Sequence, residues 1–324
     1  MGTVVKQTKY KDMDAVSIEN DLICAKFIPS QGAKLCSIVY KDTGKEFMLQ
    51  REGTKYRKSK YGESYLEGEC SGFDDMFPTI DEFLYAEAPW KDVKLPDHGE
   101  LWAIPWNSEL EEHSICLKVK GVRLPYEIEK RITFIAEDTL LISYRLKNLC
   151  EDQMEGIWAA HMMMESEKGC KFKFPDVMSK AYCTISDSKL IGEYGDKFYY
   201  PLIKQKSGEI YDMSIHRGMD ISDYQKFYFA DKMSEGWAKI LYPDGHEFSI
   251  AFPKESVPYL GAIQGEGGRF NIRCMFLEPC TGAFDRPDIA KQYKMNSLIK
   301  PFEELSWTLE IRIAKSDKIK KYTN

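Results

Sequence analysis

Three segments far apart in the chain carry side chains that can give or take a proton. His98 stands in an Asp-His-Gly triplet and is followed eight residues later by Trp106, His161 stands in an apolar run, and Glu278 stands in a Leu-Glu-Pro triplet near the carboxyl end. A carboxylate that accepts a proton and an imidazole that donates one are the minimum equipment for opening and reclosing a pyranose ring. These segments therefore indicate acid–base chemistry on a sugar ring.

His161 lies in a run that alternates as a β-strand would. On this alternation one face carries Ile157, Ala159, His161 and Met163, and the other carries Trp158, Ala160 and Met162. An imidazole inside such an apolar strand must be hydrogen-bonded or functional, because an unpaired buried polar group is costly. Two interpretations follow: a core histidine satisfied by its neighbours, or a proton donor that faces a concave sheet.

Glu278 follows the strongly apolar run 272–277 and precedes Pro279, which ends the pairing pattern of the strand. A carboxylate at such a strand exit is partly desolvated, which raises its pKa and makes it a stronger base. We therefore predict a functional carboxylate, with a structural ion pair as the alternative. A nucleophilic role for Cys280 would need an activating imidazole, and none lies near it in the sequence.

The segment around His98 has the residues of a sugar-binding surface. Trp102 and Trp106 offer flat apolar faces on which the C–H groups of a sugar can stack. The alternative is a loop histidine whose ring is satisfied by neighbouring carbonyl groups.

Composition excludes several classes of partner. The chain has 324 residues, a formal net charge of -6 and no basic stripe, so it lacks the density of Lys and Arg that neutralises the phosphates of a nucleic acid. No apolar run approaches the roughly 20 residues that cross a bilayer, and the first residues show no signal-peptide pattern. The nine cysteines are scattered without a Cys-x-x-Cys pair, which is typical of reduced thiols in the cytoplasm.

The sequence also argues against a bound metal or nucleotide cofactor. The five histidines lack the short spacing of metal ligands. The Gly-rich segment 265–268 is not a dinucleotide fingerprint, because no strand–loop–helix unit surrounds it. We therefore expect no cofactor.

Period-two patterning dominates the chain and predicts β-strands. In the run 305–313 every odd position is apolar and every even one is polar. The runs 126–134 and 140–146 predict a long antiparallel pair, and the segment 239–252 predicts a hairpin around an Asp-Gly turn. The best short helix is 287–293, because its first residue is a proline.

Further strands are expected near the amino end, over 15–18, 22–28, 34–40 and 46–49. The irregular stretch 51–96 is more typical of a functional loop system than of a second domain. No repeat or linker divides the chain. We therefore predict an all-β fold, a single domain over residues 1–324 with two large antiparallel sheets.

Five segments, in the order of the chain, resemble the galactose mutarotase-like superfamily, the aldose 1-epimerases and their relatives. The stretch NDLICAKFIPSQGAKLCSIVYKDTGKEFML resembles the opening meander of the family, and GFDDMFPTI resembles its Gly-rich segment ending in Phe-Pro. DHGELWAIPW resembles the His-Gly signature with a tryptophan eight residues on. WAAHMMM and FLEPCTG resemble the segments that bear the catalytic histidine and the catalytic glutamate.

The resemblance implies a β-supersandwich with the sugar bound in a groove on one concave sheet. Glu278 would be the general base that takes the proton of the anomeric hydroxyl, and His161 the general acid that protonates the ring oxygen. The open-chain aldehyde would rotate about C1–C2 and reclose on either face. His98 would hydrogen-bond the substrate, and no cofactor is implied.

The chain departs from relatives that act on hexose 6-phosphates. They carry an arginine shortly before Phe-Pro and another four residues after the signature histidine, and Cys70 and Trp102 stand at about those places here. A phosphorylated sugar would lack its bidentate partners, which favours an unphosphorylated monosaccharide. The family's substrate-binding aspartate has two candidate positions, Asp75 and Asp231. From the residues alone, a turn-forming or solvated acid is favoured over a binding role for Asp75.

Two other functions remain open. One is a non-catalytic carbohydrate-binding protein on the same sandwich. The other is a glycoside hydrolase or lyase, which would need a second carboxylate across the cleft from Glu278. The sequence is compatible with a monomer or a homodimer.

Overall fold

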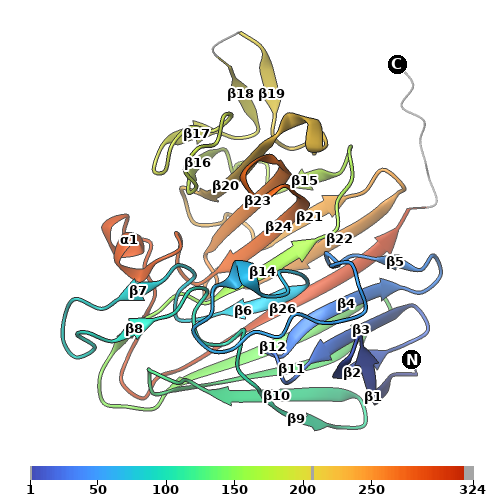
Figure 1. Cartoon of the computed structure of the whole chain (residues 1–324), viewed down its shortest axis with the longest axis vertical. Coiled ribbons are helices and arrows are strands. Elements are labelled where there is room, and N and C mark those ends of the chain that lie inside the picture. The colour runs from blue at the N-terminus through green and yellow to red at the C-terminus, as the bar shows by residue number, and fades with distance from the viewer. Residues whose placement is uncertain (1, 206–207, 317–324) are drawn as a thin grey trace.

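The computed structural model describes residues 2–205 and 208–316 of the chain. Strands dominate this part, and most of them belong to two large antiparallel sheets, as the period-two pattern predicts (Figure 1). The predicted all-β fold class is confirmed.

The larger sheet has 12 strands in the described part of the chain and carries the segments with His161 and Glu278. Its order is β1 (Val4–Tyr10), β2 (Met13–Glu19), β3 (Ile23–Ile28), β4 (Lys34–Tyr40), β6 (Phe73–Met76), β14 (Ala159–Met164), β24 (Ile272–Cys280), β23 (Tyr259–Gly267), β20 (Asp223–Phe229), β16 (Lys180–Cys183) and β17 (Lys197–Tyr199), and β5 (Lys45–Glu46) pairs with β4.

The second sheet has eight strands within the described residues. Its order is β15 (Lys171–Lys173), β21 (Trp237–Leu241), β22 (His246–Ala251), β26 (Glu304–Lys315), β12 (Thr139–Asn148), β11 (Tyr126–Ala136), β10 (Ser114–Lys120) and β9 (Asn107–Leu110).

Three two-stranded ribbons and four short helical segments complete the described elements. The ribbons are β7 (Phe83–Leu84) with β8 (Lys94–Leu95), β13 (Met154–Glu155) with β25 (Leu298–Ile299), and β18 (Leu202–Lys204) with β19 (Ile210–Asp212). The helical segments are the 3₁₀ turns η1 (Tyr65–Glu67), η2 (Met219–Ile221) and η3 (Gly268–Phe270) and the α-helix α1 (Pro287–Gln292). The helix begins at Pro287, as predicted, because a proline at this position gives up no helical hydrogen bond.

The predicted strand pairs form with the predicted partners. β11 and β12 pair antiparallel from Tyr126–Asn148 to Ala136–Thr139, and β21 and β22 form the hairpin around Gly245, whose φ of 87° suits glycine. The segment 46–49 is an exception. Strand pairing stops after Glu46, because the chain turns to lie beside β14 and Met48 makes a single bridge to Met164.

The main core lies between the two sheets. β26 shows how the pattern builds it, since Trp307, Leu309 and Ile311 are buried and alternate with more exposed polar residues. Trp307 stacks on Tyr144 of β12, with ring centroids 5.2 Å apart, and both rings lie against Trp158, just before β14 of the other sheet. This packing buries the inner face of the 12-stranded sheet against the second sheet. The outer face of the 12-stranded sheet is not part of this core.

None of the helices in the described part of the chain is long and apolar enough to span a membrane.

Candidate active site

The register of the strands aligns five residues in a row across the middle of the 12-stranded sheet. His161 on β14 pairs with Asp74 on β6, and the register of β14 against β24 places Glu278 opposite His161. On β23, Gly261 pairs with Glu278 on one side and with Tyr228 of β20 on the other. Residues from distant parts of the chain are therefore neighbours on one sheet.

Because side chains alternate between the two faces of a strand, the side chains of this row lie on the outer face of the sheet. Around His161, the side chains of Ala160 and Met162 belong to the core between the sheets, whereas Ala159 and Met163 belong to a separate apolar cluster on the outer face. The predicted division of this strand into two faces is confirmed.

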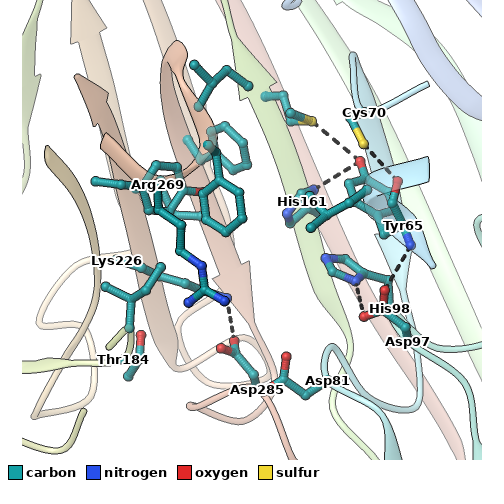
Figure 2. A pocket seen from close by; sticks show the side chains of 18 of the residues that line it. Tyr65, Cys70, Asp81, Asp97, His98, His161, Thr184, Lys226, Arg269 and Asp285 are labelled. Carbon is teal, nitrogen blue, oxygen red and sulfur yellow. Dashed lines mark hydrogen bonds and ion pairs between the residues drawn. The ribbon is translucent and has the colours of Figure 1, made fainter. Parts of the chain in front are cut away.

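A cavity of about 380 Å³ lies over this part of the outer face (Figure 2). Its lining combines apolar rings and aliphatic side chains with a group of polar side chains. The polar and charged lining residues include Asp81, Asp97, His98, His161, Thr184, Lys226, Arg269 and Asp285. The cavity is closed below by β14, β24, β23 and β20, so its floor is a rigid sheet.

His161 lines this floor, whereas Glu278 is not among the lining residues and lies beside His161 in the sheet that forms the floor. The Nε2 atom of His161 lies 3.5 Å from Oε1 of Glu278, and the two residues are 4% and 0% exposed. Within the described residues, neither carboxylate oxygen of Glu278 has a hydrogen-bond partner. A Cβ atom at position 261 would lie 3.0 Å from Oε2 of Glu278, so glycine there leaves space for this carboxylate.

Burial shifts the pKa of each group in the direction that favours its neutral form. Burial raises the pKa of Glu278 to about 7; Lys226 and His98 oppose this increase, and Asp285 adds to it. Burial also lowers the pKa of His161 well below its ordinary 6.5, and the nearby positive charges of His98 and Lys226 lower it further. Near pH 7 the glutamate therefore titrates while the imidazole is neutral.

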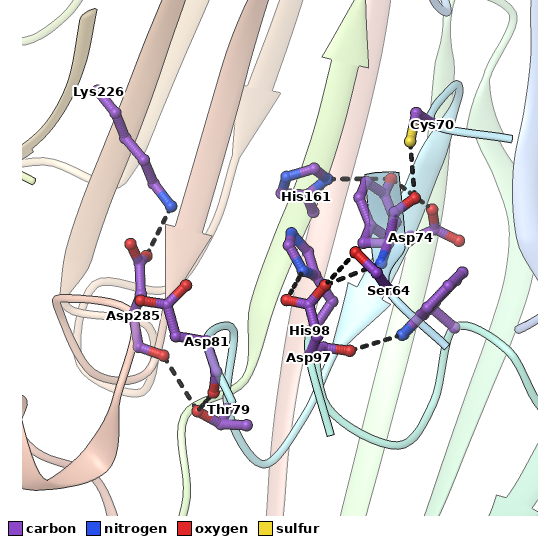
Figure 3. Close-up of polar contacts among 12 residues, drawn as sticks. Ser64, Cys70, Asp74, Thr79, Asp81, Asp97, His98, His161, Lys226 and Asp285 are labelled. Carbon is purple, nitrogen blue, oxygen red and sulfur yellow. Dashed lines mark hydrogen bonds and ion pairs between the residues drawn. The ribbon is translucent and has the colours of Figure 1, made fainter. Parts of the chain in front are cut away.

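His98 reaches the same place from a loop. Its backbone has a φ of 60°, and its Nδ1 lies 2.7 Å from Oδ1 of Asp97. The ring centroids of His98 and His161 are 5.3 Å apart (Figure 3). Burial alone would raise the pKa of Asp97, but its hydrogen bonds with His98, Tyr65 and Ser64 and the charge interaction with His98 together outweigh that effect and lower the pKa.

Tyr65, on η1, contacts both histidines. Its ring stacks on that of His98 with centroids 4.1 Å apart and an interplanar angle of 11°. Its hydroxyl lies 3.4 Å from Nδ1 of His161 and donates to Oδ2 of Asp74 at 2.9 Å. Tyr65 therefore links the loop that carries His98 to the strand that carries His161.

Lys226 and Asp285 form the opposite wall (Figures 2 and 3). The ammonium group of Lys226 donates to Oδ1 of Asp285 at 2.7 Å, and the hydroxyl of Tyr228 donates to the same oxygen at 2.9 Å. Asp81 lies nearby, and its pKa is raised by burial and by the negative charge of Asp285. With Arg269, which lines the same cavity, the charged groups here are two carboxylates and two cations, so the wall is not a purely cationic surface.

The structure brings three of the predicted site residues together, His98, His161 and Glu278. It does not bring Asp75 or Trp106 to the cavity. Asp75 points into the core between the sheets, where it pairs with Lys130 at 2.7 Å and accepts from Nε1 of Trp158 at 3.0 Å. Its side chain is one register step away from that of Asp74, and a single step reverses the face of a strand.

Trp106 and Asp231 also lie outside the residues that line the cavity. Trp106 is 4% exposed, packs in the core under the ammonium group of Lys130 at 5.3 Å, and donates from Nε1 to the carbonyl of Leu101. Asp231 lies in an exposed bend just after β20. Neither position suits direct contact with a sugar in this cavity.

Several cavity residues were not predicted from the sequence, chiefly Tyr65, Lys226 and Asp285. Lys226 had a recognisable signal, since it stands in the aromatic strand 224–229, where an unpaired lysine would be costly. Tyr65 lies in the stretch 51–96, which has no periodicity that could place a side chain.

No group of three or more His, Cys, Asp or Glu side chains suited to a metal ion occurs among residues 2–205 and 208–316. The expectation that the protein uses no metal remains a prediction.

Comparisons with known proteins identify the fold. A family model described as a domain of unknown function, DUF5107, matches residues 2–92. A search of curated proteins found no match.

Solved structures match almost the whole chain. A galactose mutarotase related enzyme from Lactobacillus acidophilus is 15% identical, with a TM-score of 0.67 over 94% of this chain and 99% of that one. A galactose mutarotase-like protein from Clostridium acetobutylicum is 14% identical, with a TM-score of 0.65 over 97% and 99%. A protein from Klebsiella pneumoniae named as a candidate aldose 1-epimerase is 14% identical, with a TM-score of 0.72 over 96% and 83%. The chain therefore has the galactose mutarotase-like fold, as the sequence resemblance implies.

Proposed function

We propose that the protein is a carbohydrate isomerase that interconverts the α and β anomers of an aldose. The observation that carries this proposal is the pair formed by His161, which lines the cavity, and Glu278, which lies 3.5 Å from it in the sheet below, with both glutamate oxygens lacking a partner in the described residues. A buried carboxylate without partners is unfavourable unless a ligand supplies them. The names of the structural neighbours support a sugar as that ligand.

The mechanism needs only proton transfers. In the reactive form the single proton of the pair has moved from Glu278 to Nε2 of His161. Glu278 then takes the proton of the anomeric hydroxyl while Nε2 of His161 gives its proton to the ring oxygen. The C1–O5 bond breaks as the C1–O1 bond becomes a carbonyl, and the open-chain aldehyde rotates about C1–C2. Ring closure on either face returns both protons. A glutamate with a pKa of about 7 suits this task, because a general base works best when its pKa lies near the working pH.

Charge in the cavity supports an unphosphorylated substrate. The ammonium group of Lys226 is already paired with Asp285, and Asp81 and Asp97 also line the cavity. A phosphate group would meet these carboxylates without the two arginines that hexose 6-phosphate relatives use. The hydroxyl groups of a neutral aldose can donate to the same carboxylates.

The test is the rate at which the purified protein equilibrates the anomers of neutral aldoses, measured by NMR exchange. We expect acceleration for at least one aldose, with kcat/KM falling as the pH rises above about 7, because Glu278 and His161 must together keep one proton and the pair loses it there. Glu278→Gln should lower kcat by 10²- to 10⁴-fold, roughly the contribution of a general base. Glu310→Gln, the same change on β26 of the other sheet, is the matched control and should retain full activity.

Other outcomes would refute the proposal. Sugar binding that survives Glu278→Gln without any rate effect would indicate a carbohydrate-binding protein. Release of sugar from an oligosaccharide end would indicate a hydrolase or lyase, with Asp81 or Asp285 as the second carboxylate. No acceleration with any common neutral aldose would reject the isomerase.

A further inference from the structure

A chain of buried polar groups leads from the interior of the sheet to His161. Lys34 lies 2.8 Å from Oδ2 of Asp74, the same oxygen accepts from the hydroxyl of Tyr65 at 2.9 Å, and that hydroxyl lies 3.4 Å from Nδ1 of His161. Lys34, Asp74 and Tyr65 are 2%, 0% and 3% exposed. Nothing in the proposed reaction yet uses these three residues.

The donors and acceptors in this chain fix the direction of each hydrogen bond. An ammonium group can only donate, and an ionised carboxylate can only accept. Lys34 opposes the rise in the pKa of Asp74 that burial causes, and so favours the ionised carboxylate. The single hydroxyl hydrogen of Tyr65 is therefore used on Asp74, and burial, aided by Asp74, raises the tyrosine pKa and retains that hydrogen. The tyrosine oxygen has only lone pairs left to offer His161.

The other nitrogen of the imidazole faces the reacting groups. Nε2 lies 3.5 Å from the carboxylate of Glu278. Nδ1 faces the hydroxyl of Tyr65 (Figure 2). A neutral imidazole carries one hydrogen, and the position of that hydrogen is set by the partner of each nitrogen.

We propose that Tyr65 and Asp74 are positioning residues that hold the hydrogen of His161 on Nδ1 and so present Nε2 as the atom that takes up and returns the reacting proton. Lys34 keeps Asp74 in the accepting state. Their effect on the rate rests on the proposed isomerase function, whereas the tautomer of His161 is a property of the folded protein alone.

The first test is the tautomer in the wild-type protein, read by ¹⁵N NMR after labelling of histidine. The chain has five histidines, so the spectrum is small enough to assign, with His161→Gln identifying the signals of interest. We expect a protonated Nδ1 and an unprotonated Nε2 for His161 near neutral pH. A protonated Nε2 in the wild type would overturn the inference without any kinetic measurement.

The second test removes one hydroxyl group. Tyr65→Phe keeps the ring that stacks on His98 but leaves Nδ1 of His161 without an acceptor. Both tautomers should then be populated, and kcat should fall on the order of 10- to 100-fold with KM changed less than about threefold, because ground-state binding is retained. Tyr200→Phe also removes a buried hydroxyl without a partner in the described residues, away from the cavity, and should change neither quantity.

The third test reverses the hydrogen bond. Replacing the ion pair with apolar residues, Lys34→Met together with Asp74→Leu, avoids leaving one buried charge alone. The hydroxyl of Tyr65 then has His161 as its acceptor, so the imidazole should change to the tautomer protonated on Nε2. A wrong tautomer in a serine protease lowers kcat about 10⁴-fold, and we expect a loss on the order of 10²-fold or more here.

The outcomes separate this inference from the proposed function. An active wild type in which Tyr65→Phe alters neither the tautomer nor kcat would overturn the positioning role and leave the isomerase standing. A wild type that is inactive on every aldose but has Nδ1 protonated, with the tautomer reversed in the double variant, would support the positioning of His161 and reject the isomerase.

Discussion

Two buried carboxylates lie on opposite faces of the same sheet and have opposite surroundings. Asp75 faces the core between the sheets, where Lys130 pairs with one oxygen at 2.7 Å and Trp158 donates to the other at 3.0 Å. Glu278 lies on the outer face beside His161, in the sheet under the cavity, and neither of its oxygens has a hydrogen-bond partner within the described residues. A satisfied buried carboxylate holds a structure together, whereas an unsatisfied one opposes folding and marks a place where a ligand is missing.

The adjacent pair Asp74 and Asp75 shows the same contrast over one step of a strand. Asp75 pairs with Lys130 inside the core, and Asp74 is part of the chain of hydrogen-bonded groups that ends at His161. The inner face of the 12-stranded sheet therefore serves stability, and its outer face carries the groups suited to chemistry. Carboxylate-to-amide changes, which alter charge and hardly alter shape, test this division on each face.

The largest effect on stability is expected for Asp75→Asn. The change leaves the ammonium group of Lys130, which is fully buried, without its counter-charge. Removing one partner of a buried ion pair destabilises by about 3–5 kcal/mol. Denaturant unfolding should show this loss, and the rate of anomer exchange per folded molecule should stay within about threefold of wild type. A loss of activity without a loss of stability would place Asp75 in the site instead.

Glu278→Gln is expected to increase the free energy of unfolding, whereas Asp75→Asn decreases it. The pKa of Glu278 is about 7 in the folded protein against an ordinary 4.5, so the folded state binds more protons than the unfolded state between these values. The protonated glutamate is tolerated below pH 4.5, and stability is lost as the pH rises through about 7. A difference of about 2.5 pKa units corresponds to about 3 kcal/mol.

The measurement for this prediction is the difference in unfolding free energy between wild type and Glu278→Gln at two pH values. The variant should be more stable by up to about 3 kcal/mol at pH 8 and nearly equal to wild type near pH 4.5. Using the difference removes the contribution of His161, whose lowered pKa gives the reverse slope in both proteins. A variant less stable than wild type at pH 8 would show that the carboxylate has partners after all.

Much of this division could be predicted from the sequence, because it depends on period-two alternation. That pattern gave the two sheets and placed His161 on the face opposite Trp158, as the structure confirms. It could not place Asp75, because β6 has four residues and its face is set by pairing with β4 and β14, which lie far away in the chain. The same holds for Tyr65, whose contacts with His98 and His161 come from a segment without regular structure.

The two aspartate positions suggested by the resemblance show a second limit of prediction from the sequence. The resemblance suggests Asp231 without a motif around it, and the structure puts Lys226, five residues earlier, at the cavity and Asp231 in an exposed bend. Lys226 obtains its counter-charge from Asp285, which follows β24 and has no local signal in the sequence around β20. Pairs of this kind depend on the arrangement of strands and cannot be found from local pattern alone.

The smallest effect on activity is expected for Arg269→Ala, at the rim of the cavity. Arg269 lies on η3 and lines the cavity, and no ion pair is found for it among the described residues, whereas Lys226 is paired and buried. If the substrate is a neutral aldose, Arg269→Ala removes no charge that the substrate uses. We expect kcat/KM for glucose or galactose to change less than about twofold.

A phosphorylated sugar would give a different result for the same variant. A hydrogen bond to a charged group contributes about 1.5–3 kcal/mol, so a phosphate held by Arg269 would make the loss on the order of 10- to 100-fold. The comparison is kcat/KM for a hexose and for its 6-phosphate, in wild type and Arg269→Ala. A wild type that prefers the phosphate, with the preference lost in the variant, would overturn the unphosphorylated substrate. It would also show that one exposed guanidinium outweighs the carboxylates Asp81, Asp97 and Asp285 that line the same cavity.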